Sequence, residues 1–141
     1  MPEGRIQIGE VAERTGLSVR TIRFYEESGL VEPSARSQGG FRLYTDDDVA
    51  RLHTIRRLKP LEFSLEEIRD VLSLLDRLAD RLSPRAAGQD CTELLARLAM
   101  YRELADQRVA ALYAAWSTAV EFATHLRRQS EIYQFLPGVR R

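Results

Sequence analysis

The chain has 141 residues, a formal net charge of zero and a single cysteine. This length suits one domain with an appendage, and the lone cysteine excludes an intrachain disulfide and cannot by itself complete a cysteine-based zinc site. No apolar run reaches the roughly 18 residues of a membrane-spanning helix, and the N-terminal stretch MPEGRIQIGE lacks the pattern of a signal peptide. We therefore expect a cytoplasmic protein without membrane contact.

Two short helices separated by a tight turn are predicted near the N-terminus. In the stretch IQIGEVAERT, residues 6–15, apolar residues recur at helical spacing. Gly16 can adopt the left-handed conformation that ends a helix, and Ser18 is a good N-cap for a second helix that extends to about Ser28. A helix, a short turn with glycine and a second helix are typical of a helix-turn-helix.

The second helix combines arginines with a threonine on one side. At about 100° per residue, Ile22 faces the first helix, whereas Arg20, Thr21 and Arg23 face outward. Arginine can bind a guanine edge or a phosphate, and threonine can contact either. An ordinary solvated face is the alternative for two arginines, but the helix-turn-helix context favours DNA.

A β-hairpin is predicted next, with arms at residues 30–32 and 41–44 and Gly40 in the loop. A hairpin packed beside a helix-turn-helix is a wing. Its Arg36 and Arg42 would then contact phosphates, which position a protein on DNA without reading bases. A surface hairpin with ordinary arginines is the alternative.

A third helix is predicted to begin with a capping box formed by Thr45 and Asp48 and to end at Pro60. Arg56 and Arg57 lie near its end. They either contact a backbone phosphate or stabilise the helix through its C-terminal dipole. A fourth helix extends to about residue 81, and its inward-facing residues are Leu65, Ile68, Leu72 and Leu75.

A long helix is predicted after the linker SPRAAGQD, because residues 90–129 contain neither glycine nor proline and apolar residues recur every seven positions. Such a helix is roughly 60 Å long. A small monomer cannot bury its apolar stripe, so we expect pairing with a second copy. The residues predicted for dimerisation are Leu94, Leu98, Tyr101, Ala105, Leu112, Trp116, Ala119, Phe122 and Leu126.

These features, in this order, resemble the MerR family of bacterial transcription regulators. The matching stretches are IGEVAERTGLSVRTIRFYEESGLVEP, GGFRLYTDDDVARLHTIRRLKPLEFSLEEI and the long C-terminal helix. The resemblance implies a mainly α fold with a winged helix-turn-helix domain at 5–75 and the end of the fourth helix with a linker at 76–89. It also implies an antiparallel coiled-coil dimerisation helix at 90–130 and a tail at 131–141 as a candidate effector region.

The resemblance also implies a function. A homodimer of this family binds a pseudo-palindromic element in double-stranded promoter DNA and distorts the duplex for RNA polymerase, to activate or repress transcription. Three positions depart from the family pattern, namely Glu62, where glycine is common, Pro60, which is not usual there, and Phe41, where tyrosine is usual. The DNA-binding residues implied by the resemblance are Val19, Arg20, Thr21, Arg23, Tyr25, Arg36, Gly40, Phe41 and Arg42.

What the protein senses is left open by the sequence. Metal-sensing members carry paired cysteines after the long helix, and this chain has no cysteine there. Cys91 falls near the position of one thiolate of the mercury-sensing members, but their other two thiolates have no counterpart in this chain. We therefore expect no metal site and no cofactor. The late aromatic residues either pack in the dimer or line a site for a small-molecule ligand; they are Tyr113, Trp116, Phe122, Tyr133 and Phe135.

The same residues also bear on functions of another class. The sequence shows no nucleophile with a base and no paired inward carboxylates, so an enzyme is not expected. The alternative to a regulator is a coiled-coil protein-interaction adaptor that has lost specific DNA binding. The retained arginines of the second helix and the wing argue against it.

Overall fold

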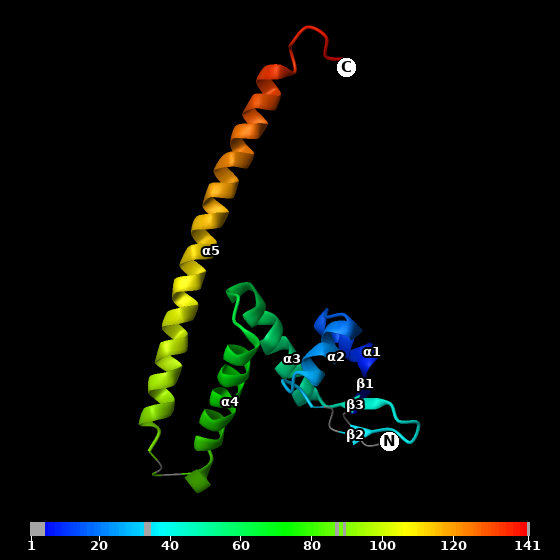
Figure 1. Cartoon of the computed structure of the whole chain (residues 1–141), viewed down its shortest axis with the longest axis vertical. Helices are drawn as coiled ribbons and strands as arrows, with labels where there is room; N and C mark the ends of the chain where they lie inside the picture. The colour runs from blue at the N-terminus through cyan, green and yellow to red at the C-terminus, as the bar shows by residue number, and fades with distance from the viewer. Residues whose placement is uncertain (1–4, 33–34, 87, 89, 141) are drawn as a thin grey trace. The chain divides into compact units, whose positions relative to one another are not determined.

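The computed structural model describes residues 5–32, 35–86, 88 and 90–140. The chain divides into two compact units, Met1–Ala99 and Met100–Arg141, and its fold is mainly α (Figure 1). The elements in chain order are β1 (Ile6–Gln7), α1 (Ile8–Thr15), α2 (Val19–Glu27), β2 (Ala35–Arg36), β3 (Arg42–Tyr44), α3 (Asp46–Leu58), the 3-10 turn η1 (Lys59–Leu61), α4 (Leu65–Arg81), the 3-10 turn η2 (Pro84–Ala86) and α5 (Thr92–Tyr133).

The predicted helix-turn-helix is confirmed in α1 and α2. Gly16 ends α1 with a positive φ of 70°, and its N–H donates to the carbonyl of Ala12 at 2.9 Å. Ser18 starts α2, because its side-chain oxygen accepts from the backbone N–H of Thr21 at 3.0 Å. The turn is therefore held at both ends by local contacts that sequence spacing alone can reveal.

The small sheet differs from the predicted hairpin. It has three strands in the order β1-β3-β2, both pairs antiparallel, with Ile6 opposite Tyr44 and Arg36 opposite Arg42. The predicted first arm at 30–32 is wrong, because these residues form no strand and β3 pairs instead with Ala35–Arg36. Leu30 and Val31 are each 1% exposed and belong to the core. Strand β1 was not predicted, since a two-residue strand is too short to show alternation.

Helices α3 and α4 begin at the predicted caps. In the capping box of α3, the N–H of Asp48 donates to Thr45 Oγ1 at 3.2 Å and the N–H of Thr45 donates to Asp48 Oδ2 at 2.8 Å. One predicted core residue of α4 is wrong: Leu75 is 41% exposed, whereas Leu74 is 2% exposed. The inward face of α4 is therefore rotated towards Leu74 and Val71, which is also buried.

Arginines of α3 and α4 hold the ends of the helix-turn-helix. Arg56 Nη1 donates to the carbonyl of Thr15, the last residue of α1, at 2.5 Å. After α2, Arg69 Nη2 donates to the carbonyl of Ser28 at 2.6 Å, and Arg51 Nε donates to that of Leu30 at 2.6 Å. Positive groups are stabilising at helix C-termini, where carbonyls lack intrahelical partners. These contacts fix the orientation of α2.

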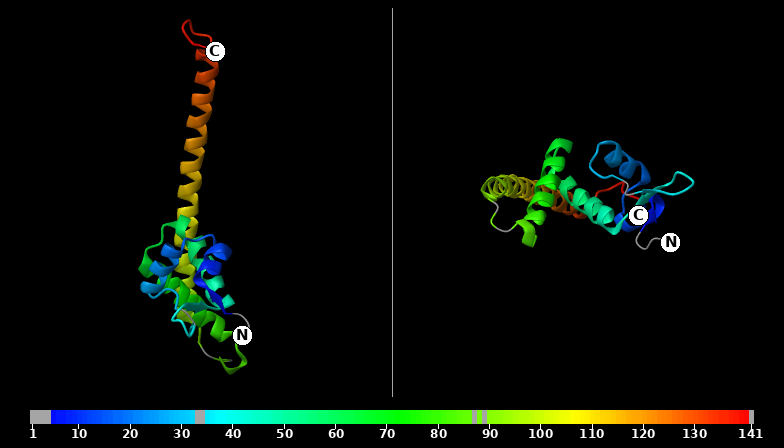
Figure 2. Two further views of the ribbon diagram at one scale, coloured as in Figure 1. Left: turned by 90° about the vertical axis from the view of Figure 1, so that its right-hand side faces the viewer. Right: turned by 90° about the horizontal axis from the view of Figure 1, so that it is seen from below.

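Helix α5 is unbroken over 42 residues, about 63 Å (Figures 1 and 2). Its start is fixed by Asp90, whose Oδ1 accepts from the backbone N–H and the hydroxyl of Thr92 at 2.9 and 2.6 Å. These hydrogen bonds lower the pKa of Asp90. None of the described helices is long and apolar enough to cross a membrane.

Candidate nucleic-acid interface

Helix α2 presents two arginines whose guanidinium groups have no partner among the described residues. Arg20 and Arg23 are exposed, and neither has a hydrogen bond or ion pair with another described residue. Thr21 is half-buried, and its hydroxyl lies 2.8 Å from that of Ser18. A free guanidinium carries five N–H donors and a full positive charge. The outward face of α2 can therefore bind an anion or the edge of a base.

The remaining predicted positions of α2 support this face from below. Val19 is half-buried, and Tyr25 is 7% exposed, so its ring packs in the core. The neighbouring Phe24 is 49% exposed, and the two ring centroids lie 5.8 Å apart. An exposed phenylalanine next to Arg20 and Arg23 gives the face an apolar group that can contact a thymine methyl.

The wing, defined as β2, β3 and the loop between them, has a tightly bonded tip. The N–H of Ser37 donates to the carbonyl of Phe41 at 2.8 Å, and the N–H of Gly40 donates to that of Ser37 at 2.9 Å. Gly40 has a positive φ of 78°, which glycine adopts without strain. Phe41 is 64% exposed. The side chain of Arg36 lies outside the described part of the structure.

An acidic residue of α2 joins the recognition helix to the wing. Glu26 Oε1 lies 2.6 Å from Arg42 Nε, and Glu26 Oε2 accepts from the hydroxyl of Tyr44 at 2.7 Å. The contact with Arg42 is an ion pair rather than an aligned hydrogen bond, since the buried Nε–H has no hydrogen-bond partner among the described residues. Burial and the hydrogen bond to Glu26 raise the pKa of Tyr44.

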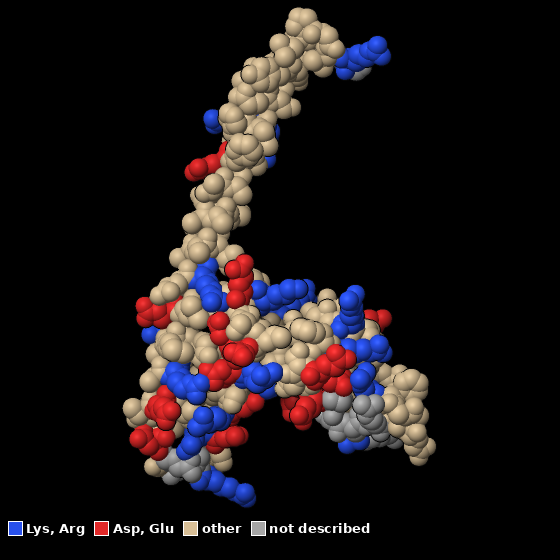
Figure 3. Space-filling model, in the orientation of Figure 1, with Lys and Arg blue, Asp and Glu red and all other residues tan. Residues whose placement is uncertain are grey.

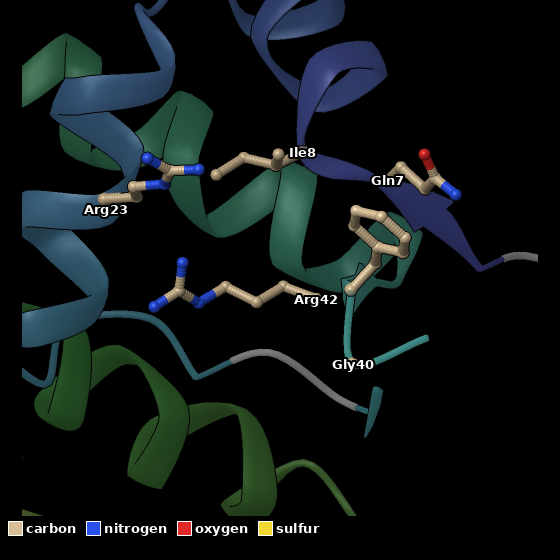
Figure 4. Close-up of a pocket in the computed structure, with 6 residues that line it drawn as sticks. Gln7, Ile8, Arg23, Gly40 and Arg42 are labelled. Carbon is tan, nitrogen blue, oxygen red and sulfur yellow. The ribbon is translucent and has the colours of Figure 1, made fainter. Parts of the chain in front are cut away.

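One hollow brings the recognition helix and the wing together. It has a volume of about 220 Å³, and Figure 4 shows the guanidinium groups of Arg23 and Arg42 on the same side of it. Arg20 lines an adjoining hollow with Arg23, Phe24 and Glu27. The residues that line the first hollow are Gln7, Ile8, Arg23, Gly40, Phe41 and Arg42.

Four predicted DNA-binding residues, Arg23, Gly40, Phe41 and Arg42, thus meet at one place. Gln7 and Ile8 were missed by sequence reasoning. Their position follows from the pairing of β1 with β3, in which Gln7 lies opposite Leu43. No local pattern in the sequence indicates this pairing, because the two strands are short and far apart along the chain.

The residues predicted for dimerisation fall into two groups. Leu94 and Tyr101 are already buried in the single chain, at 3% and 9% exposed, and Leu98 and Ala105 are half-buried. The exposed group comprises Leu112, Trp116, Ala119, Phe122 and Leu126. An apolar surface available to a partner therefore lies in the later part of α5, which is mostly uncharged on the face that Figure 3 shows.

Within the described residues, no group of three His, Cys, Asp or Glu side chains is arranged to hold a metal ion. The donors that do gather, on α2 and the wing, are arginines, which bind anions and bases rather than cations.

This arrangement of a helix-turn-helix, a wing sheet and outward arginines defines the class of winged helix-turn-helix DNA-binding transcription regulators. The family model described as MerR HTH family regulatory protein matches residues 6–75. The HTH-type transcriptional regulator HmrR of Sinorhizobium medicae is 35% identical over 111 residues, which cover 68% of this chain and 76% of that protein. The chain belongs to the MerR family.

Two further likenesses bear on the extent of the match. The nodulation protein NolA of Bradyrhizobium elkanii is 48% identical over 82 residues, which are 55% of this chain but only 37% of NolA. The structure of HiNmlR, a MerR family regulator that lacks the sensor domain and was solved bound to promoter DNA, aligns with a TM-score of 0.69. It covers 96% of this chain and 97% of that one at 23% identity, which shows a common fold.

Proposed function

We propose that this protein is a transcription regulator that binds a pseudo-palindromic element in double-stranded promoter DNA as a homodimer. In this proposal α2 enters the major groove and the wing contacts the DNA backbone. The protein distorts the duplex and thereby activates or represses transcription by RNA polymerase. It acts in the cytoplasm and has no enzymatic activity. The observation on which the proposal depends is that Arg20, Arg23 and Arg42 lie around two adjoining hollows of α2 and the wing.

The homodimer is proposed from the apolar surface of α5. Large side chains remain exposed through its later half, among them Leu112 at 44%, Trp116 at 60% and Phe122 at 61%. Exposed apolar surface of this extent marks an interface rather than a solvated face. An antiparallel coiled coil of two α5 helices would cover it and would place two recognition helices on one duplex.

The tail at 131–141, which begins in the last turn of α5, is proposed as the place for an effector. Tyr133 and Phe135 are 53% and 73% exposed, and Leu136 is 52% exposed. Apolar and aromatic side chains of this kind suit an organic ligand better than a metal ion. Cys91, half-buried, is the single thiol of the chain, so a thiolate metal site would need ligands from elsewhere.

A footprint of the purified protein on its own upstream promoter tests the proposal. We expect protection centred between the −35 and −10 elements, unchanged by a chelator or a reductant. The coiled-coil adaptor predicts a dimer without protection of any duplex, so the same experiment, with light scattering on the same sample, separates the two functions. Protection far from the promoter elements would contradict the proposed distortion of promoter DNA.

A further inference from the structure

Two arginines from different elements line one hollow, and no acidic residue is among the residues that line it. Arg23 comes from α2 and Arg42 from β3, and both line the hollow between helix and wing (Figure 4). Arg23 has no partner among the described residues, and the recorded partner of Arg42, Glu26, lies against Nε alone. Among the described residues, the terminal nitrogens of both guanidinium groups therefore have no partner, and both side chains line the same hollow.

The local charge of this cluster does not cancel. Glu26 is the acid that pairs with Arg42, and its side chain is 11% exposed. Its second oxygen is occupied by the hydroxyl of Tyr44. Both carboxylate oxygens of Glu26 thus have partners on β3, and among the described residues no ion pair joins Glu26 to Arg23. Two guanidinium groups and one carboxylate leave one positive charge, which equals the charge that a single phosphodiester would neutralise.

We propose that Arg23 and Arg42 together bind one backbone phosphate of the DNA and that Glu26 is the positioning residue that aims Arg42 at it. This inference rests on the proposed function and assigns Arg23 a role different from base reading. The recognition of bases by arginine then falls to Arg20, which lies in the adjoining hollow with Phe24.

A phosphate fits this arrangement better than a base does. A guanine edge offers two acceptors in one plane, and a single guanidinium occupies both. A phosphodiester has two non-bridging oxygens with lone pairs in several directions, so that two guanidinium groups can bind it at once. A phosphate held between α2 and the wing would fix the depth at which the recognition helix enters the groove.

The first test is a double-mutant cycle on the full chain with Arg23→Ala, Arg42→Ala and the double variant. The probe is a random-sequence duplex, because a phosphate contact is independent of sequence, and affinity is measured over a series of KCl concentrations. Each single variant should weaken binding about tenfold. The loss of affinity in the double variant should be much smaller than the product of the two single losses, because both arginines bind one phosphate.

The salt dependence gives an independent count of phosphates. In the double variant, the magnitude of the slope of log affinity against log salt should decrease by about 0.9, the value for one phosphate. Two separate phosphates would decrease it by about 1.8. Arg77→Ala is the matched control, because Arg77 is an exposed arginine of α4 without a partner among the described residues. Circular dichroism during heating checks that each variant is folded.

The positioning role of Glu26 is tested by the sign of its effect. Removing a negative charge near DNA should by itself strengthen binding, and this is the expected result for Glu27→Gln, the exposed neighbour on α2. Glu26→Gln should instead weaken binding several-fold, because Arg42 is no longer aimed. The effect should vanish in an Arg42→Ala background, which a general change in stability would not produce.

Several outcomes would overturn the inference. Additive losses in the cycle would place the two arginines on separate phosphates, and stronger binding by Glu26→Gln would remove its positioning role. Displacement of the duplex by inorganic phosphate, beyond that by chloride at equal ionic strength and only when Arg23 is present, would assign the hollow to free phosphate. A wild-type protein that binds no duplex at all would contradict the proposed function itself.

Discussion

Glu26 Oε1 lies 2.6 Å from Arg42 Nε, so an acid of the recognition helix holds an arginine of the wing strand. The hydroxyl of Tyr44, which is fully buried, donates to the other oxygen of the same carboxylate. One carboxylate with two partners on β3 thus ties the recognition helix to the wing strand.

Tyr44→Phe tests this junction through stability and pH. Below pH 10 the variant should be less stable by about 1–2 kcal/mol, because Glu26 loses a buried hydrogen bond. The folded protein raises the pKa of Tyr44 above its ordinary value of 10.0. As the pH rises above 10, the unfolded chain therefore releases this proton before the folded chain does. The free energy of unfolding of the wild type then decreases by as much as about 1.4 kcal/mol per pH unit.

The measurement is urea unfolding of wild type and variant from pH 8 upward, a range chosen around the ordinary tyrosine pKa. The difference in free energy of unfolding should narrow as the pH rises above 10. A difference between wild type and Tyr44→Phe that stays constant with pH would show that Tyr44 ionises normally.

Arg56 and Arg57 are adjacent arginines with different expected effects on stability. Arg56 donates to the carbonyl of Thr15 at the end of α1, whereas Arg57 is exposed and has no partner among the described residues. Arg56→Ala should lower the free energy of unfolding by about 1 kcal/mol, and Arg57→Ala should change it by less than about 0.5 kcal/mol. Equal effects of the two substitutions in thermal unfolding would argue against a capping role for Arg56.

Glu62 occupies a backbone conformation that suits glycine. Its φ is 55°, and among the described residues it is the one non-glycine residue with a positive φ. Glu62→Gly should raise the free energy of unfolding by about 1 kcal/mol, because the side chain opposes this conformation. Glu62→Ala keeps a Cβ and should bring no gain. If alanine stabilised the protein as much as glycine, the charge and not the backbone would be responsible.

Leu112→Glu tests the proposed dimer. A charge in the seam of two α5 helices should shift the protein to a monomer at micromolar concentration, because a buried unpaired carboxylate costs several kcal/mol. Ala110→Glu adds the same charge two positions away, outside the heptad stripe, and should remain a dimer. Light scattering measures both. A monomeric wild type at this concentration would contradict the coiled-coil proposal before either variant is compared.

The sequence by itself determined the helices of this protein. The caps of α2 and α3 join residues three apart, as in the hydrogen bonds of Ser18 with Thr21 and of Thr45 with Asp48. The long helix was evident because residues 90–129 lack helix breakers and keep a heptad spacing. Such signals involve residues close together in the sequence, so they can be recognised without knowing the tertiary packing.

Only the tertiary structure decided how the candidate site is assembled. The sheet order β1-β3-β2 depends on strands of two or three residues, which carry no periodicity of their own. Two contacts join residues far apart along the chain, namely that of Arg56 with Thr15 and that of Glu26 with Arg42. The burial of Leu30 likewise depends on tertiary packing. An arginine looks the same in the sequence whether it faces DNA, a helix end or a carboxylate, because its partner is chosen by packing.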